Sequence, residues 1–385
     1  MINIISSYVI QFCVMLTPFI VLPLISRGLI KDEFDSFLVL QSFCIWASTL
    51  VEYGYNITAP KLVQKNRENV SIILFSKFFL GLVTFIISSF TLAFLGLSPL
   101  ESFLGSVYTI LLGGNFYWYF LSVNELKISS KYETVSSVVT ISSFLILAKI
   151  GTLTLSICLA TLCFGRGIPL ILSLITILKM EHIQRPSIAQ VKNNIADATH
   201  SFIFRVGGSL YTVANGIILN FAQGTNFASQ YLQAERLVKA CFMGAIIPLN
   251  NGLYTKVLSK KVNKLKYIIF VTVISLFLCI GLYLLKGELI YYFYGTVNYE
   301  VEKYFSLFLI ILPVISIINT FNYLYIFPNR LEHYSSIVML MVGIVNIITA
   351  FPIINTYGVT GFIYLNIAME IMVLGLIYII YKVKA

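Results

Sequence analysis

Long stretches of this chain carry no charged residue, and they limit the possible fold more than any other feature of the sequence. Four of them are Phe78 to Leu100, Ser102 to Asn124, Tyr267 to Leu285 and Tyr304 to Asn329. Each is near the roughly 20 residues that an α-helix needs to cross the hydrocarbon core of a bilayer. The hydrophobic fraction of 58%, the charged fraction of 11% and the mean hydropathy of +0.89 exclude a soluble enzyme. Open sheets are impossible in lipid and barrel strands would alternate, so we expect helices.

The apolar stretches and the turn-formers between them predict an all-α polytopic membrane protein with about twelve transmembrane helices. The expected helices lie near residues 4–28, 36–60, 71–95, 102–124, 133–150, 152–178, 197–221, 226–252, 267–288, 304–327, 334–354 and 358–381. The last apolar stretch, Tyr334 to Met369, is too long for one helix, and Pro352, Asn355 and Gly358 divide it into two of the expected helices. We expect an N-terminal lobe (1–180), a cytoplasmic linker (181–196) and a C-terminal lobe (197–385), as in transporters built from internal repeats.

Lysine and arginine are concentrated in alternate loops, which sets the expected orientation. The loops assigned to the cytoplasm contain Lys61, Lys65, Arg67, Lys127, Lys131, Lys179, Arg185, Lys192, Lys256, Lys260, Lys261, Lys264, Lys266, Arg330, Lys382 and Lys384. Both termini are then cytoplasmic. These topology signals lie beside anionic lipid headgroups and explain the net charge of +10 without a nucleic-acid partner. The cysteines lack the spacing of a zinc site or a disulfide framework, and we expect them to be small packing residues.

Arg205, Arg236 and Lys239 lie deep within the seventh and eighth expected helices. A cation at mid-bilayer costs roughly 2.5–3.5 kcal/mol on insertion scales, so such residues are kept for a reason. Polar residues of the seventh helix recur at spacings of three and four, which places them on one face, and the eighth helix has a similar stripe. The two stripes are Asp197, Ser201, Arg205, Gly208, Thr212 and Asn215, and Ser229, Gln233, Arg236, Ala240 and Met243. The pattern predicts a wet, cationic cavity for an anion.

The alternative interpretation is that these charges neutralise one another within packed helices. Glu235 and Lys239 can pair at i,i+4, and Arg205 can pair with some carboxylate. Against this, the intramembrane cations outnumber the carboxylates. The cations are Arg27, Arg166, Arg205, Arg236 and Lys239, and the carboxylates are Glu52, Glu235 and Glu370. The surplus is positive, which favours the anion cavity.

Four further features allow two interpretations each. Arg166 either lines the cavity or pairs with a carboxylate, and Glu370 is either an ion-coupling site or a packing polar group. His200 could carry a proton, although a hydrogen-bonded packing role is favoured. The aromatic cluster 116–120 is interpreted as core and interface belt, with sugar stacking as the minority interpretation.

Short motifs follow one another in a recognisable order along most of the chain. They are Pro23-Leu24-Ile25-Ser26-Arg27, Glu52-Tyr53-Gly54-Tyr55-Asn56 with Ala59, Trp118-Tyr119-Phe120 with Glu125, Tyr231-Leu232-Gln233-Ala234-Glu235-Arg236-Leu237, and Pro248 to Tyr254. In these the chain resembles Wzx-type O-antigen flippases, in the polysaccharide-transporter branch of the MATE-like MOP superfamily. It departs from that family by Glu52 in place of the usual Asp, Arg236 in place of the usual Lys, no Gly after Phe34, and Leu121-Ser122 in place of Gln-Gly. Charge is kept at Glu52 and Arg236.

The resemblance implies a V-shaped transporter with a central cavity between two lobes. The cavity would be lined largely by the first, second, seventh and eighth helices, with Arg27, Glu52, Arg205, Arg236 and Lys239 around one chamber. The implied substrate is an oligosaccharide on undecaprenyl diphosphate, flipped by alternating access from the cytoplasmic to the periplasmic leaflet of the bacterial inner membrane. Arginine suits this cargo because its planar donors match phosphate oxygens. The resemblance also implies that this protein contacts the polysaccharide polymerase machinery.

Energy coupling and two other function classes stay open at this point. Glu52, Glu235 or Glu370 could bind H⁺ or Na⁺, and no other cofactor is expected. A MATE-like drug or metabolite antiporter would have the same architecture, but cationic drugs favour an acidic chamber. A membrane-embedded polysaccharide polymerase or ligase would also need arginines, but such enzymes typically carry a large outer loop and here the outer loops are short. We therefore expect a transporter and no enzymatic activity.

Overall fold

The computed structural model describes residues 2–250, 263–326, 328–329 and 331–384. Nearly all of these residues are helical and none of them lies in a strand, which confirms the expected all-α class. Seven helices are long and apolar enough to cross a membrane, or eight if one bent pair is a single span. The protein is therefore a multi-pass membrane protein. The count of about twelve spans is not confirmed for the described residues and stays a prediction.

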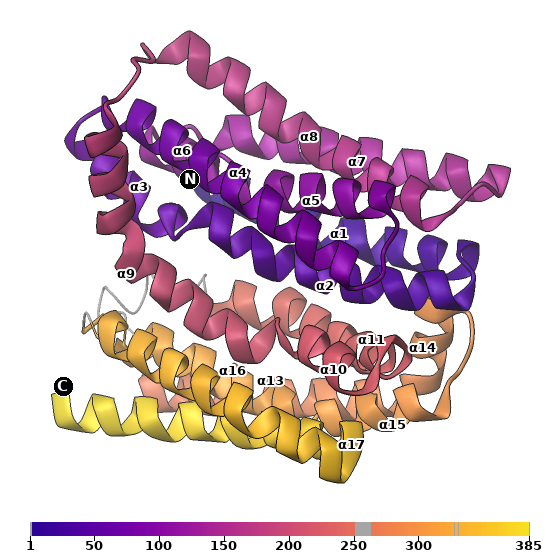
Figure 1. The fold of residues 1–385 in the computed structure, drawn as a ribbon. Helices are drawn as coiled ribbons and strands as arrows, with labels where there is room; N and C mark the ends of the chain where they lie inside the picture. Colours follow the sequence, from indigo (N-terminus) through magenta and orange to yellow (C-terminus); the bar gives the residue numbers. More distant parts are fainter. Residues whose placement is uncertain (1, 251–262, 327, 330, 385) are drawn as a thin grey trace. The chain divides into compact units, whose positions relative to one another are not determined.

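The chain divides into two compact units, Met1–Val206 and Gly207–Ala385. The first contains α1 (Ile2–Gly28), α2 (Lys31–Glu52), α3 (Tyr55–Lys65), α4 (Asn69–Phe94), α5 (Pro99–Gly113), α6 (Tyr117–Ser122), α7 (Leu126–Ile150), α8 (Leu155–Met180) and most of α9 (Ile188–Thr212). Its long helices run alongside one another: α1 packs against α7, α7 against α8, and α5 against α2, α4 and α8 (Figure 1). The units are defined by packing alone, so the predicted lobes stay a prediction.

One core cluster of the first unit is aromatic. Trp118, Tyr119 and Phe120 of α6 are fully buried, and their rings meet edge to face at centroid distances of 6.0 and 5.4 Å. Tyr55 of α3 is buried in the same cluster. The core interpretation of these three rings is thereby confirmed, and their burial leaves no ring face for a sugar.

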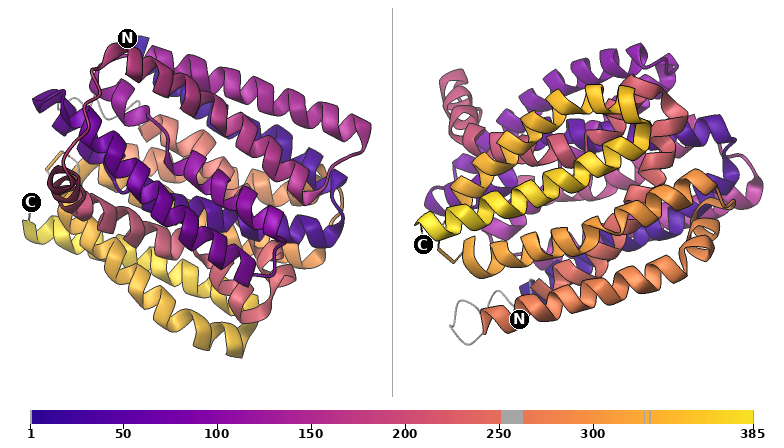
Figure 2. Two further views of the ribbon diagram at one scale, coloured as in Figure 1. Left: turned by 45° about the horizontal axis from the view of Figure 1, so that its top comes forward. Right: turned by 90° about the horizontal axis from the view of Figure 1, so that it is seen from below.

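The second unit contains α10 (Asn215–Gln223), α11 (Thr225–Cys241), the π-helix η1 (Phe242–Ile246), α13 (Lys264–Leu284), α14 (Lys286–Tyr294), α15 (Tyr299–Phe308), α16 (Ile311–Phe321), the π-helix η2 (Asn322–Ile326) and α17 (Glu332–Lys384). Here α11 packs against α10 and α15, while α17 packs against α10 and α16. Gly358, with φ of 62°, breaks α17 into two arms that turn back on each other (Figure 2). The predicted division of the last apolar stretch at Gly358 is confirmed.

Several expected helices are interrupted or shifted. The helix expected at 36–60 breaks at Tyr53 and Gly54, and the helix expected at 102–124 breaks between α5 and α6. The helix expected at 197–221 begins at Ile188 and breaks after Thr212, so much of the predicted linker 181–196 is helical. Asn194 and Ala198 of this helix are buried. Residues 251–262 and Arg330, with Lys256, Lys260, Lys261 and the predicted helix end at 252, lie outside the described residues.

Candidate functional site

Glu52 is the last residue of α2, at the point where that helix is broken. Tyr53 and Gly54 both adopt left-handed conformations, with φ of 45° and 74°, before α3 begins. A carboxylate at a helix C-terminus faces the negative end of the helix dipole, which is unfavourable. Only 7% of Glu52 is exposed, so water cannot compensate for its charge. A buried carboxylate in this position needs a cation beside it.

Arg205 of α9 provides that cation. Its Nη2 donates a hydrogen bond to Glu52 Oε2, although the two residues lie 153 positions apart in the chain. The Arg205 side chain is 42% exposed, whereas the Glu52 side chain is 9% exposed. The guanidinium carries five N–H donors in a fixed plane, so its exposed side keeps donors that the carboxylate does not use. The interpretation that Arg205 pairs with a carboxylate is confirmed.

Close packing at the α2–α3 break holds α9 in place. A Cβ on Gly54 would lie 2.6 Å from Ser201 Cβ and 2.8 Å from the Phe202 amide nitrogen, so only glycine permits this approach. The Tyr53 ring stacks on the Phe202 ring, with centroids 4.2 Å apart, and its hydroxyl lies 3.3 Å from Thr199 Oγ1. The helix that carries Arg205 is therefore docked on the residues that follow Glu52.

Lys77 is a buried cation in the same unit that the sequence analysis did not single out. It lies in α4, is 5% exposed, and its Nζ donates to the Asn115 carbonyl oxygen at 2.9 Å. That carbonyl follows the end of α5, where Gly113 lies against Ser48 and Val51 of α2. The apolar stretch was counted from Phe78, so Lys77 fell outside it. Its place within the helix expected at 71–95 was the available signal.

Arg166 of α8 pairs with Glu133 of α7, with Nη1 and Oε2 3.2 Å apart. This ion pair confirms the pairing interpretation of Arg166. Both side chains are mostly buried, at 30% and 16% exposure. The sequence-based count of intramembrane charges had omitted both the carboxylate Glu133 and the cation Lys77, so the predicted positive surplus is unchanged.

Arg27 and Arg236, two other cations of the predicted chamber, are located in different units. Arg27 lies exposed in the last turn of α1, and Arg236 lies half-buried in α11. The chamber that would unite them stays a prediction. His200 is exposed on α9, and this exposure does not support a packing role.

Lys239 of α11 forms the expected pair in the second unit. Its Nζ donates to Glu235 Oε1 at 2.9 Å and to the Thr212 carbonyl oxygen at 2.6 Å. That carbonyl lies at the C-terminal end of α9, where a cation is favourable. Glu235 is 9% exposed and Lys239 is 40% exposed, which repeats the pattern of a buried carboxylate with a half-exposed cation. The i,i+4 pair predicted from the sequence is confirmed.

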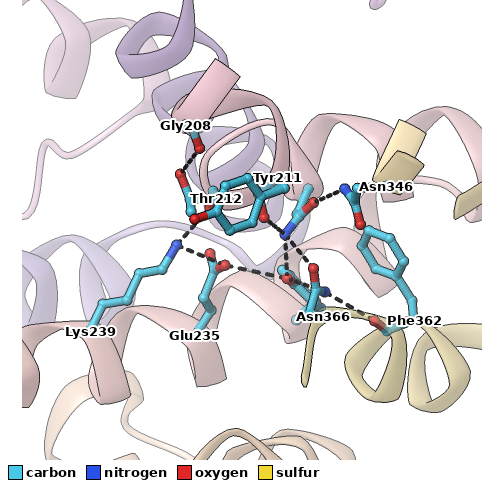
Figure 3. A network of polar contacts seen from close by, with 10 residues as sticks. Gly208, Tyr211, Thr212, Glu235, Lys239, Asn346, Phe362 and Asn366 are labelled. Atoms are coloured by element: carbon cyan, nitrogen blue, oxygen red, sulfur yellow. Dashed lines mark hydrogen bonds and ion pairs between the residues drawn. The ribbon is translucent and has the colours of Figure 1, made fainter. Parts of the chain in front are cut away.

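A network of buried amides extends from this pair across the second unit (Figure 3). Tyr231 Oη donates to Glu235 Oε1 at 3.3 Å and accepts from Asn215 Nδ2 at 3.1 Å. Asn215 also donates to Asn366 Oδ1 at 2.9 Å and accepts from Asn346 Nδ2 at 3.1 Å. These asparagines are at most 5% exposed. Gly208, Thr212 and Asn215 of the network had been placed on the predicted polar stripe. Tyr231 comes from α11, and Asn346 and Asn366 come from the two arms of α17.

Glu370 lies beside this network, on the lining of a small cavity. The cavity has a volume of about 40 Å³ and is also lined by Glu235, Lys239 and Asn366. A space of this size holds about one water-sized particle. Two carboxylates, a lysine and two buried amides thus contribute to the lining of this space.

Known proteins similar to this chain were found at the level of family and of fold. The family model described as polysaccharide biosynthesis protein matches residues 1–254. A relative in Escherichia coli (strain K12) is 25% identical over 285 residues, which cover 70% of this chain and 68% of the relative. A relative in Shigella dysenteriae is 24% identical over 395 residues, which cover 96% of this chain and 97% of the relative. Both are named, provisionally, as O-antigen transporters.

Two kinds of solved structure share the fold. The lipid II flippase MurJ in an inward closed conformation matches with a TM-score of 0.72 at 15% identity, over 100% of this chain and 87% of that chain. An outward-facing multidrug resistance MATE family transporter of the MOP superfamily matches with a TM-score of 0.62 at 12% identity, over 99% of this chain and 96% of that chain. At such identities the likeness shows the fold alone, which is that of MOP superfamily transporters.

Proposed function

This chain belongs to the polysaccharide biosynthesis protein family, and we propose that it is a flippase for undecaprenyl-diphosphate-linked O-antigen repeat units. It moves them from the cytoplasmic to the periplasmic leaflet of the bacterial inner membrane by alternating access. The observation that carries this proposal is the half-exposed Arg205 guanidinium on the buried Glu52 carboxylate. Guanidinium binds phosphate oxygens through two parallel hydrogen bonds. The relatives named for O-antigen transport and the fold shared with a lipid II flippase support a lipid-linked saccharide as cargo.

The diphosphate is held mainly by Arg205 and Arg236. Arg205 supports this role because its side chain is 42% exposed while its position is fixed by Glu52. Arg27 and Lys239 contribute further positive charge, and Arg166 contributes least because Glu133 already neutralises it. A diphosphate and polar sugars cannot cross hydrocarbon unaided, since unpaired polar groups there are costly. The lipid tail stays in the bilayer throughout.

Transport is driven by H⁺ or Na⁺ acting on buried carboxylates. Glu52 and Glu235 are each nearly buried, and each is paired with a cation whose side chain is about 40% exposed. Glu370 borders the small cavity beside Glu235. Neutralising such a carboxylate by a proton or a metal ion would release its cation partner for the cargo. No other cofactor and no enzymatic activity are part of this proposal.

The orientation completes the proposal. Both termini are cytoplasmic, as the alternate basic loops indicate. Cargo delivered to the periplasmic leaflet is consumed by polymerisation, so the flippase contacts the polysaccharide polymerase machinery.

The test is to delete the gene and locate the lipid-linked repeat units. We expect them to accumulate on the cytoplasmic leaflet, where a membrane-impermeant glycosidase or lectin added to right-side-out cells does not reach them. The wild-type gene supplied in trans is expected to restore both access and surface glycan. Repeat units that reach the periplasmic leaflet at the normal rate in the deletion strain would refute the proposal.

Drug export is the second candidate, because multidrug MATE transporters share the fold. It requires the same deletion strain to become sensitive to cationic drugs while its surface glycan stays normal. The two functions therefore give opposite results in one strain.

A further inference from the structure

We propose that Lys77 is a positioning residue: it receives the Glu52 carboxylate when an anionic headgroup takes Arg205, and so makes Arg205 available to the cargo. This inference rests on the proposed function and deepens it. Arg205 contacts the cargo through its guanidinium, whereas Lys77 contacts no cargo and only exchanges with Arg205 as the partner of Glu52.

The first support is that Glu52 is only partly satisfied in its pair with Arg205. Oε2 accepts from Arg205, whereas Oε1 is buried and has no hydrogen-bond partner among the residues that the structure describes. Burial of an unsatisfied carboxylate oxygen is costly, and its position at the C-terminus of α2 adds to that cost. Glu52 therefore has unused capacity for a second cation.

The second support is that Lys77 is a buried cation with donors to spare. An ammonium has three N–H donors, and within the described part of the chain only the bond to the Asn115 carbonyl is found. At 5% exposure Lys77 has little access to water or to cargo. A buried ammonium in this state is stabilised by any carboxylate that moves toward it.

The third support is that Lys77 and Glu52 belong to helix segments that pack close to each other. The Asn115 carbonyl that binds Lys77 lies two residues beyond Gly113, and a Cβ on Gly113 would lie 2.4 Å from the Ser48 carbonyl oxygen and 2.6 Å from Val51 Cβ. Val51 directly precedes Glu52. Lys77 is thus anchored beside the turn of α2 that carries the carboxylate.

The direction of the exchange follows from exposure. The Arg205 side chain is 42% exposed, so an arriving phosphate meets Arg205 and not Lys77. Phosphate and Glu52 then compete for one guanidinium and repel each other. The Glu52 side chain, at 9% exposure, cannot follow Arg205 into water. Its stable alternative is the buried ammonium of Lys77.

The experiment is a double-mutant cycle on the full-length protein in lipid nanodiscs, with inorganic pyrophosphate as the probe. Lys77→Gln keeps a donor for the Asn115 carbonyl but removes the charge, and Glu52→Gln removes the competitor of the probe. We expect Lys77→Gln to weaken pyrophosphate binding about tenfold in the wild-type background. In the Glu52→Gln background the same change should alter affinity by less than about twofold.

Matched variants separate this role from a structural one. Lys77→Arg should bind like wild type, and Lys179→Gln, which removes an exposed lysine at the end of α8, should have no effect beyond that of net charge. An equal loss on Lys77→Gln in both backgrounds, or no loss in either, would overturn the inference alone. Absence of any Arg205-dependent pyrophosphate binding by the wild-type protein would overturn the inference together with diphosphate recognition.

Discussion

At the scale of single residues, the same kind of ion pair occurs twice: a nearly buried carboxylate binds a half-exposed cation. Glu52 holds Arg205 in the first unit, and Glu235 holds Lys239 in the second. A cation held this way is fixed in position and still accessible, which is what capture of an anionic headgroup requires. Removing the cation should therefore lower both cargo binding and stability, because a buried carboxylate is left without its partner.

Arg205→Ala should therefore lower stability as well as transport. We expect a loss of about 1–3 kcal/mol, less than for a fully buried pair because Arg205 is half exposed. Arg205→Ala combined with Glu52→Gln should recover most of that stability but no transport. The measurements are thermal unfolding in detergent and surface-glycan production. If the double variant makes normal glycan, Arg205 does not bind the cargo.

The contrast between the two pairs shows what sequence can predict at this scale. Glu235 and Lys239 are one helical turn apart, so spacing alone predicted their contact. Glu52 and Arg205 meet only because α9 docks at the break after α2, and no local pattern encodes that distance. Glu133 was missed because it lies near a helix end, and Lys77 because it lies just before an uncharged run.

At the scale of elements, helix breaks place the polar groups. The α2–α3 break puts Glu52 at a helix end, and the break after Thr212 gives Lys239 a carbonyl oxygen to bind. Breaks of this kind are tolerated in membrane helices only where protein or water satisfies the freed backbone groups. The sequence predicted the break at Gly358, where Pro352 and Asn355 lie close by. It gave no comparable warning at Tyr53, a residue that seldom adopts positive φ.

Gly54→Ala should undock α9 from this break. The new Cβ would lie 2.6 Å from Ser201 Cβ and 2.7 Å from the Ser201 carbonyl carbon, and φ is 74°. Gly151→Ala is the matched control, because Gly151 has the same φ of 74° but nothing within 4 Å. We expect a loss of about 1 kcal/mol from conformation alone in the control and at least about 2 kcal/mol more at Gly54. Equal unfolding midpoints for the two variants would contradict the docking described for α9.

Lys239→Met should loosen the junction between α9 and α10. It removes the cation from the Thr212 carbonyl and leaves Glu235 without its ion-pair partner, for an expected loss of about 1–3 kcal/mol. Hydrogen exchange of the backbone amides of residues 209–216 should rise, while exchange in α13 stays unchanged. Lys239→Arg is the conservative control. Unaltered exchange at the junction would show that Lys239 does not hold it.

At the scale of the whole molecule, each unit carries a nearly buried carboxylate that is paired with a half-exposed cation. In the proposed mechanism, an ion that neutralises Glu52 or Glu235 frees the cation of that unit and so changes the affinity for cargo. Binding of cargo would in turn release the ion, by the reciprocity of linkage. Under this proposal an ion gradient would drive flipping through the linkage, without any direct contact between ion and cargo.

Ion coupling is tested in proteoliposomes that contain lipid-linked repeat units. We expect an imposed H⁺ or Na⁺ gradient to raise the initial rate of flipping several-fold, since even 1.4 kcal/mol of coupling corresponds to tenfold in an equilibrium constant. Glu52→Gln or Glu235→Gln should retain slow flipping that no longer responds to the gradient, because the neutral amide cannot exchange the ion. Glu370→Gln should behave likewise if the small cavity beside Glu235 is the ion site. Glu68→Gln, at an exposed glutamate before α4, is the control. Flipping that is indifferent to both gradients and to the membrane potential in the wild-type protein would rule out coupling and leave the carboxylates as holders of their cations.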